Sequence, residues 1–310
     1  MPAKRIATVL KFLVPLVIAF FIGRVIYDNW QEVSGAAWSF RPLELGVSFL
    51  LTGWWFVARP PVWAYILDHF GYKLTFLQSF EVVRKGELSR YVPGTIWQYL
   101  SRIYLAGLHG VPAHATIATT LVETVILVLA SIVPALWFLP ETLPALNRYH
   151  RFALWIIPVA ACVLLHPKVL NFWAKRLSSR LGQPYEPLRI HWRAMAGIWL
   201  FFLLTWLILG TSVALFVRGV IDTPWAALPR LVSDHALAWL VGMLSMIAPA
   251  GMGVRDGMFG LLVSRRMPLG TAMTVAVGVR LWLTLAELVW TFGVLLFLKR
   301  RQARLEDDSP

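Results

Sequence analysis

The sequence of 310 residues has little charge for its length. Only 15% of the residues are charged, against 58% that are hydrophobic, and the mean hydropathy is +0.65. A soluble domain of average composition carries about 25% charged residues, enough to cover its surface. The 16 acidic and 29 basic residues here give thin cover. The composition therefore excludes ordinary soluble and disordered proteins, and it predicts an all-α polytopic membrane protein with one integral membrane domain, residues 1–310.

Cysteine and the common catalytic signatures are also scarce. Cys162 is the single cysteine and lies in an apolar run. Because one cysteine cannot form an intramolecular disulfide, a disulfide-rich secreted domain is excluded. The sequence has no G-x-S-x-G, P-loop or H-E-x-x-H pattern. His109 and His114 are five positions apart and do not share a helical face, so no metal site follows from them. These patterns predict no catalytic residue, no metal and no cofactor.

The net charge of +13 has a membrane explanation. Cytoplasmic loops of membrane proteins collect Lys and Arg, and anionic lipid headgroups are their natural partner, so nucleic acid is not needed to account for the charge. The start of the chain, with Lys4 and Arg5 followed by an apolar stretch to Tyr27, resembles a signal peptide. It contains no small-x-small cleavage site, so we expect a retained transmembrane helix.

The chain contains two kinds of apolar segment, uninterrupted ones and ones that Pro and Gly interrupt. Six are long enough to cross a membrane, which takes about 20 residues: 6–27, 43–66, 113–139, 151–167, 195–217 and 270–298. Two others, 79–110 and 231–267, are interrupted near their middle by Pro93-Gly94 and by Pro249-Ala250-Gly251-Met252-Gly253. Neither limb is long enough to cross comfortably. We therefore predict two re-entrant helical hairpins, each packed within the protein.

The distribution of charge predicts an orientation. With both hairpins entering and leaving on one side, 19 basic residues lie on the side of the N-terminus and 8 on the other. Arg59, Arg84, Arg90 and Arg102 are among the 19. The positive-inside rule then places both termini, the loop 168–193 and the short tail 299–310 in the cytoplasm.

The two halves of the sequence resemble each other at a shift of 156 residues. Gly86-Glu87-Leu88-Ser89 falls on Gly242-Met243-Leu244-Ser245, Pro93 on Pro249 and Pro112 on Pro268. Each half, 1–150 and 151–298, holds three spans and one hairpin, and an odd number of spans inverts the second half. Inverted repeats with paired broken helices are typical of secondary transporters, whose substrate site lies near the midplane. The alternative is chance similarity between two apolar segments with Pro-Gly breaks.

Basic residues next to the two turns are candidates for anion binding. Arg90 precedes the first turn and Arg102 follows it, so both can point toward a shared polar site; the alternative is that they reach the aqueous interface. A helix that starts near Val254 would present free N–H groups, and Arg255 adds a positive charge there. Asp256 could pair with Arg255 or cap that helix, and the pair could equally serve only to hold the turn.

Further ionisable residues lie within the apolar segments. They are Glu123, Asp234, Arg280 and Glu287. A charge at the bilayer centre costs about 2.5–3.5 kcal/mol on insertion scales, so such residues are usually paired or functional. Glu123 and Arg280 occupy nearly equivalent positions of the two halves. We predict that they form a buried ion pair, either as a structural clamp or as a gating or proton-coupling pair.

At the two hairpins the sequence resembles a known family. Gly86-x-x-x-Arg90-Tyr91-Val92-Pro93-Gly94-x-x-Trp97 and Pro249-x-Gly251-Met252-Gly253-Val254-Arg255-Asp256 are similar to signatures of the lysylphosphatidylglycerol synthase transmembrane region, the flippase-like domain family. That family more often has Glu at the position of Asp256. In full-length synthases a cytosolic aminoacyl-transferase domain follows. The segment 299–310 is too short for one, so the resemblance implies a stand-alone protein of the bacterial inner membrane.

The expected function is transport rather than catalysis. The lead hypothesis is a flippase for an anionic phospholipid or a polyprenyl-phosphate-linked lipid, with the phosphate held at the hairpin tips. One alternative is a membrane glycosyltransferase-type enzyme using a lipid-linked donor, and another is a non-catalytic accessory subunit of a cell-envelope synthase. The expected substrate-binding residues are Arg90, Tyr91, Pro93, Gly94, Trp97, Gln98, Arg102, Gly251, Gly253, Arg255 and Asp256, with Glu123, Arg280 and Glu287 as the buried or gating charges.

Overall fold

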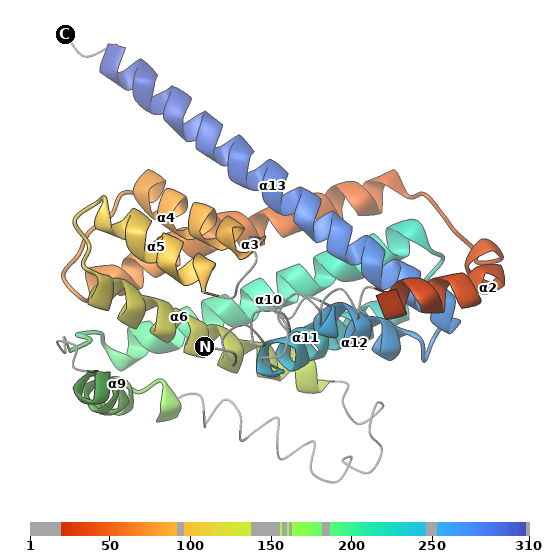
Figure 1. The fold of residues 1–310 in the computed structure, drawn as a ribbon, viewed down its shortest axis with the longest axis horizontal. Coiled ribbons are helices and arrows are strands. Elements are labelled where there is room, and N and C mark those ends of the chain that lie inside the picture. Colours follow the sequence, from red (N-terminus) through yellow and green to blue (C-terminus); the bar gives the residue numbers. More distant parts are fainter. Residues whose placement is uncertain are drawn as a thin grey trace, which may run out of the picture.

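The computed structural model describes residues 20–91, 96–137, 156, 160, 163–181, 187–245 and 253–307 (Figure 1). The structure is 84% helix, and the described residues form no strand beyond an isolated bridge between Trp38 and Ile221. Three helices are long and apolar enough to cross a membrane: α6 (Ala113–Trp137), α10 (Trp192–Val220) and the first 35 residues of α13 (Leu269–Asp307). The all-helical membrane class is thus confirmed. The number of six spans stays a prediction.

The other predicted spans agree in part with the observed helices. The predicted span 43–66 is the helix α3 (Pro42–Asp68), which contains Pro60 and Pro61 and carries a buried arginine. Residues 20–28 are helical and lead into α2 (Trp30–Ser34). Most of the predicted span 151–167 lies outside the described residues, and α9 (Pro167–Leu181) begins where it ends.

Each segment expected to form a hairpin is a pair of short helices that pack on each other. The first pair is α4 (Phe76–Leu88), which ends in the 3-10 turn η1 (Ser89–Tyr91), and α5 (Trp97–Gly107). The second is α11 (Leu228–Leu244) and α12 (Val254–Val263). All four are shorter than the roughly 20 residues needed to cross a bilayer. The turns themselves, 92–95 and 246–252, lie outside the described residues, and re-entry into a membrane stays a prediction.

Small side chains bring the long helices together. α3 and α10 run antiparallel, since the Arg41 N–H donates to the Gly219 carbonyl at one end and the Arg189 N–H donates to the His69 carbonyl at the other. Between these ends, Ser48 Oγ donates to the Ser212 carbonyl at 2.8 Å. Helices surrounded by lipid are not driven together by the hydrophobic effect. Small and hydroxyl residues let their backbones approach closely, so that van der Waals contacts and hydrogen bonds hold them together.

The helix contacts of the two halves correspond. In the first half α3 packs on α4 and α5 on α6, and in the second α10 packs on α11 and α12 on α13. Between the halves, α6 packs on α11 and α10, while α13 packs on α4 and α3. Each of these contacts therefore has its counterpart when the halves are exchanged. The inverted orientation of the halves in a membrane stays a prediction.

Candidate functional site

Seven charged side chains from six elements meet beside the first hairpin. We call them the Arg–Glu cluster, and they are Arg59 of α3, Arg84 and Glu87 of α4, Arg90 of η1, Arg102 of α5, Glu123 of α6 and Glu287 of α13. Most are almost fully buried. Four arginines face three glutamates, so the cluster carries one excess positive charge.

Glu87 lies at the centre of the cluster. Its Oε1 atom is 3.0 Å from Arg59 Nη1 and 3.9 Å from Arg102 Nη2, and its Oε2 atom accepts a hydrogen bond from Arg84. One carboxylate thus joins α3, α4 and α5. Breaking a buried pair of this kind leaves an uncompensated charge, which is strongly destabilising.

Glu123 binds two arginines of the first half of the chain. Arg59 Nη2 donates to its Oε1 atom at 3.0 Å, and Arg102 Nη1 donates to its Oε2 atom at 2.8 Å. The predicted pair between Glu123 and Arg280 is therefore wrong. Equivalent positions in two halves need not meet, because α5 and α3 lie nearer to α6 than the matching stretch of α13 does.

Glu287 connects the long helix α13 to the first hairpin. Arg84 Nη2 donates to its Oε1 atom at 2.9 Å, while Arg90 and the Tyr91 hydroxyl both donate to its Oε2 atom, the latter at 2.7 Å. Thr291, one turn further along α13, accepts from Arg84 Nε at 3.2 Å. Two turns of α13 thus fix the end of α4.

Aromatic rings and a hydroxyl complete the surroundings of these arginines. The Arg84 guanidinium lies 4.4 Å from the ring centre of Phe56, and that of Arg102 lies 5.3 Å from the ring centre of Trp63. Arg102 Nη1 also donates to Thr120 Oγ1 at 3.3 Å. Ring faces attract cations most where water is absent. The cluster is therefore an organised group of buried charges within an apolar helix bundle.

The second hairpin places a different set of charges at its tip. α12 begins at Gly253, whose φ of +82° favours glycine, and the Gly253 N–H donates to Asp256 Oδ2 at 3.2 Å. Asp256 Oδ1 is 3.7 Å from Arg255 Nε. Asp256 therefore both caps the helix and faces Arg255, the two roles that the sequence left open. Gly242 of α11 lies against the Arg255 backbone, where an added Cβ would meet Arg255 Cβ at 2.8 Å.

Arg255 and Arg280 have too few acidic neighbours. Arg255 lies close enough to Arg280, Asp256, Arg90 and Tyr91 to interact with them electrostatically, so the ends of the two hairpins lie near each other. Among the salt bridges between described residues, Arg255 has only the 3.7 Å contact with Asp256 and Arg280 has none. With the Arg–Glu cluster, six arginines face four acids. The sequences of the turns, 92–95 and 246–252, contain no charged residue that would change this balance.

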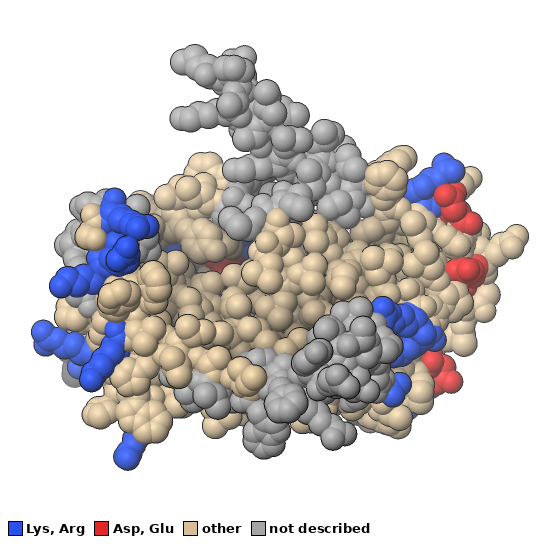
Figure 2. All heavy atoms as spheres, turned by 90° about the horizontal axis from the view of Figure 1, so that it is seen from below, with Lys and Arg blue, Asp and Glu red and all other residues tan. Residues whose placement is uncertain are grey.

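The site is partly open to the surroundings. The side chain of Arg90 is 26% exposed and that of Arg255 is 18% exposed, whereas Glu287 is 1% exposed. Figure 2 shows a broad band without charge on this face of the molecule, with a small recess in which blue and red atoms are visible.

The other predicted site residues contribute less. Trp97 and Gln98 start α5, with Trp97 exposed and Gln98 half-buried, and neither belongs to the Arg–Glu cluster. Pro93, Gly94 and Gly251 lie outside the described residues.

Arg59, Arg84 and Glu87 were missed as site residues. Counting Arg59, Arg84 and Arg102 as loop charges was wrong, since all three are buried. Arg84, Glu87 and Arg90 alternate in charge at intervals of three along α4 and η1, which puts them on one face. That spacing is the signal in the sequence that could have revealed the cluster.

One carboxylate lies outside the cluster, near the chain end of α13. Burial would raise the pKa of Glu81, but hydrogen bonding and attraction from Lys85, together with Lys299, outweigh it and hold that pKa below its ordinary value. Glu81 therefore stays ionised and ties α4 to the basic end of α13.

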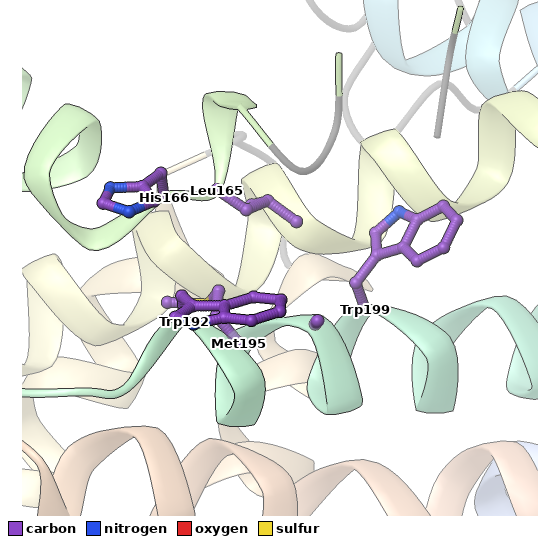
Figure 3. Close-up of a pocket in the computed structure, with 6 residues that line it drawn as sticks. Leu165, His166, Trp192, Met195 and Trp199 are labelled. Atoms are coloured by element: carbon purple, nitrogen blue, oxygen red, sulfur yellow. The ribbon is translucent and has the colours of Figure 1, made fainter. Parts of the chain in front are cut away.

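Two hollows lie elsewhere in the structure. A cavity of about 20 Å³ lies between the start of α10 and the residues before α9, and Figure 3 shows Leu165, His166, Trp192, Met195 and Trp199 around it. That volume holds about one water molecule, so it is too small for a lipid headgroup. A groove of about 340 Å³ runs between α3 and α4, lined by Pro61, Ala64, Tyr65, Asp68, Lys73, Leu74, Phe76 and Ser79. Neither hollow contains a member of the Arg–Glu cluster.

The chain matches no family model, no curated protein and no solved structure.

Proposed function

We propose that this protein is a transporter of the lipid flippase type, which moves an anionic phospholipid or a lipid-linked phosphate across a bacterial inner membrane with both of its own termini in the cytoplasm. The observation that carries the proposal is the excess of arginine at the facing hairpin tips. Arg280 has no carboxylate partner among the described residues, and Arg255 has one distant partner. A charge so placed is costly in a membrane, and a bound anion offsets that cost.

The chemistry of the site fits a phosphate. A guanidinium donates two parallel hydrogen bonds to a phosphate, and such charge-assisted bonds are about twice as strong as neutral ones. Arg90 already donates a hydrogen bond to Glu287, so Arg255 and Arg280 are the residues whose N–H groups can donate to a phosphate. The start of α12 adds backbone N–H groups that point the same way.

The surroundings fit the rest of a lipid. Helices α5 and α13 expose large apolar side chains, among them Tyr104, Leu281 and Phe292. Acyl chains could stay against these helices in the bilayer while the headgroup passes through the polar site. Short broken helices that meet at such a site are the arrangement of many secondary transporters.

The test is lipid movement in liposomes that contain the purified full-length protein. Fluorescent phosphatidylglycerol and a fluorescent polyprenyl phosphate would be tested in separate samples, with dithionite destroying label in the outer leaflet. Hydrogen bonds to charged groups contribute about 1.5–3 kcal/mol, so Arg255→Gln and Arg280→Gln should each slow transport by roughly 10-fold to 100-fold. Arg255→Lys should also be slow, because an ammonium lacks the planar fork.

Arg24→Gln is the matched control. Arg24 is exposed and pairs with Asp28 at 2.8 Å, away from the hairpins, so this variant should transport like the wild type. If the wild-type protein moves neither lipid faster than empty liposomes do, the transport proposal is wrong. If it does move lipid and the Arg255 and Arg280 variants are unchanged, the phosphate site is wrong.

A further inference from the structure

Helix α9 is set apart from the rest of the bundle by its direction. In Figure 1 α3, α6 and α10 run across the picture, whereas α9 is seen end-on at the left. Since α6 and α10 are membrane-crossing candidates, α9 is roughly perpendicular to the crossing direction. A helix so directed at one end of a membrane bundle lies parallel to the membrane surface.

A polar contact holds α9 to the protein. The side-chain amide of Asn171 donates to the Leu188 carbonyl at 3.0 Å, and its oxygen accepts from the Leu188 N–H at 2.8 Å. Leu188 belongs to the main hydrophobic core, together with Leu165 just before α9. The position of α9 is therefore fixed by Asn171 and by Leu170, which packs against the same core, while its aromatic residues Phe172 and Trp173 are exposed.

The outward side of α9 is aromatic and basic. Phe172 is 58% exposed and Trp173 is 59% exposed. Lys168, Arg176 and Arg180 follow the same interval of four residues as Phe172, so they share one stripe of the helix. Lys175 is exposed as well, and α9 contains no acidic residue. Aromatic residues with Lys and Arg on one short helix are typical of helices that lie in the membrane interface.

The surroundings of α9 extend the positive charge. Arg189 and Arg193 are exposed on the neighbouring segment, and the Arg193 guanidinium lies 5.9 Å from the ring centre of Trp192. The opposite end of the bundle differs, since Arg24 there pairs with Asp28 and Arg41 pairs with Asp222. In Figure 2 one end shows only blue residues while the other shows blue and red together.

From these contacts we infer that α9 is an interfacial helix that binds the headgroups of anionic phospholipids. Phe172 and Trp173 enter the boundary between headgroups and acyl chains, and the four basic residues of α9 contact lipid phosphates at the membrane surface. Bilayer lipid is the occupant rather than an acidic protein, because exposed aromatic rings accompany the charge. This inference does not depend on the proposed transport activity.

The test measures which lipids surround α9. A dye is attached at Ser179→Cys in a Cys162→Ser background of the full-length protein, which is placed in phosphatidylcholine nanodiscs containing a spin-labelled lipid. Spin-labelled phosphatidylglycerol should quench the dye several-fold more than spin-labelled phosphatidylcholine. Each basic residue near an anionic surface contributes about 1 kcal/mol, or roughly fivefold in binding. Replacing Lys168, Lys175, Arg176 and Arg180 with Gln should abolish the preference.

Two controls bound the result. Lys168→Arg with Lys175→Arg keeps the charge and should keep the preference, and a dye at Ala226→Cys, exposed at the opposite end, should show none. Equal quenching by both lipids in the wild type, or a preference that survives the Gln variant, would overturn the inference. A dye that neither lipid quenches would place α9 away from the bilayer and favour an acidic protein segment as its partner.

Discussion

Glu123→Gln is the change that tests the buried cluster most directly. Glu123 is 2% exposed and holds Arg59 and Arg102, and Arg59 keeps Glu87 when Glu123 is removed. Arg102 keeps the 3.9 Å contact with Glu87, a threonine hydroxyl and the Trp63 ring but no close carboxylate, so its charge is the one left uncompensated. Removing one partner of a buried pair costs about 3–5 kcal/mol.

The cost should appear as a lower melting temperature. At about 2.1 cal/mol/K per residue, 1 kcal/mol corresponds to about 1.5 °C for 310 residues, so Glu123→Gln should lower the melting temperature by roughly 5–8 °C. Adding Arg102→Gln removes the uncompensated charge and should recover at least half of that loss. The assay is the fraction of monodisperse protein after heating in detergent, measured by size-exclusion chromatography.

Arg280→Gln serves as the control for this cycle. Glu123 has no contact with Arg280 among the described residues, and distant changes add within about 0.5 kcal/mol. The effects of Glu123→Gln and Arg280→Gln should therefore be additive. A coupling of Glu123 to Arg280 that exceeds its coupling to Arg102 would refute the reasoning and restore the pairing that the sequence predicts.

Two further predictions concern stability alone. A Cβ at Gly53 would lie 2.2 Å from the Trp290 ring, and overpacking of this kind costs about 1–3 kcal/mol. Gly53→Ala should therefore lower the melting temperature by several degrees. Gly46 has open space around it, so Gly46→Ala should not lower the melting temperature. The lowered pKa of Glu81 means that its pairing with Lys85 stabilises the fold above the ordinary value of 4.5 and is lost as the pH falls through the lowered pKa. Glu81→Gln should flatten the dependence of the melting temperature on pH below pH 4.5. An unchanged slope would show that the pairing of Glu81 with Lys85 contributes nothing to stability.

The sequence predicted the breaks in the two hairpins closely. Pro93-Gly94 lies between the end of η1 at Tyr91 and the start of α5, and the Pro249–Gly253 run lies between α11 and α12. Proline removes a backbone donor and fixes φ, and glycine permits non-helical φ, so a run that combines the two favours a break in a helix. Proline alone is not sufficient, since Pro60 and Pro61 lie inside α3. Long apolar runs predicted the helices α6 and α10 with bounds close to those observed. They predicted α13 only in part, since that helix continues to Asp307, nine residues beyond the predicted span 270–298.

The partners of the buried charges were decided by the tertiary structure. Glu123 and Arg280 match in sequence position, yet Glu123 meets Arg59 and Arg102. An ion pair depends on which faces of two helices meet, and crossing geometry sets those faces through packing across the whole bundle.

Sequence alone therefore determined that this chain is an apolar helical protein with two interrupted helices and with arginines beside the interruptions. These properties are local, since they depend on hydropathy, on proline and glycine and on near neighbours along one helix. Only the tertiary structure decided that Glu87, Glu123 and Glu287 neutralise the arginines of the first hairpin and leave Arg255 and Arg280 of the second half with little compensation. Charge balance at a site is a sum over elements far apart in the chain, and it exists only after those elements have packed.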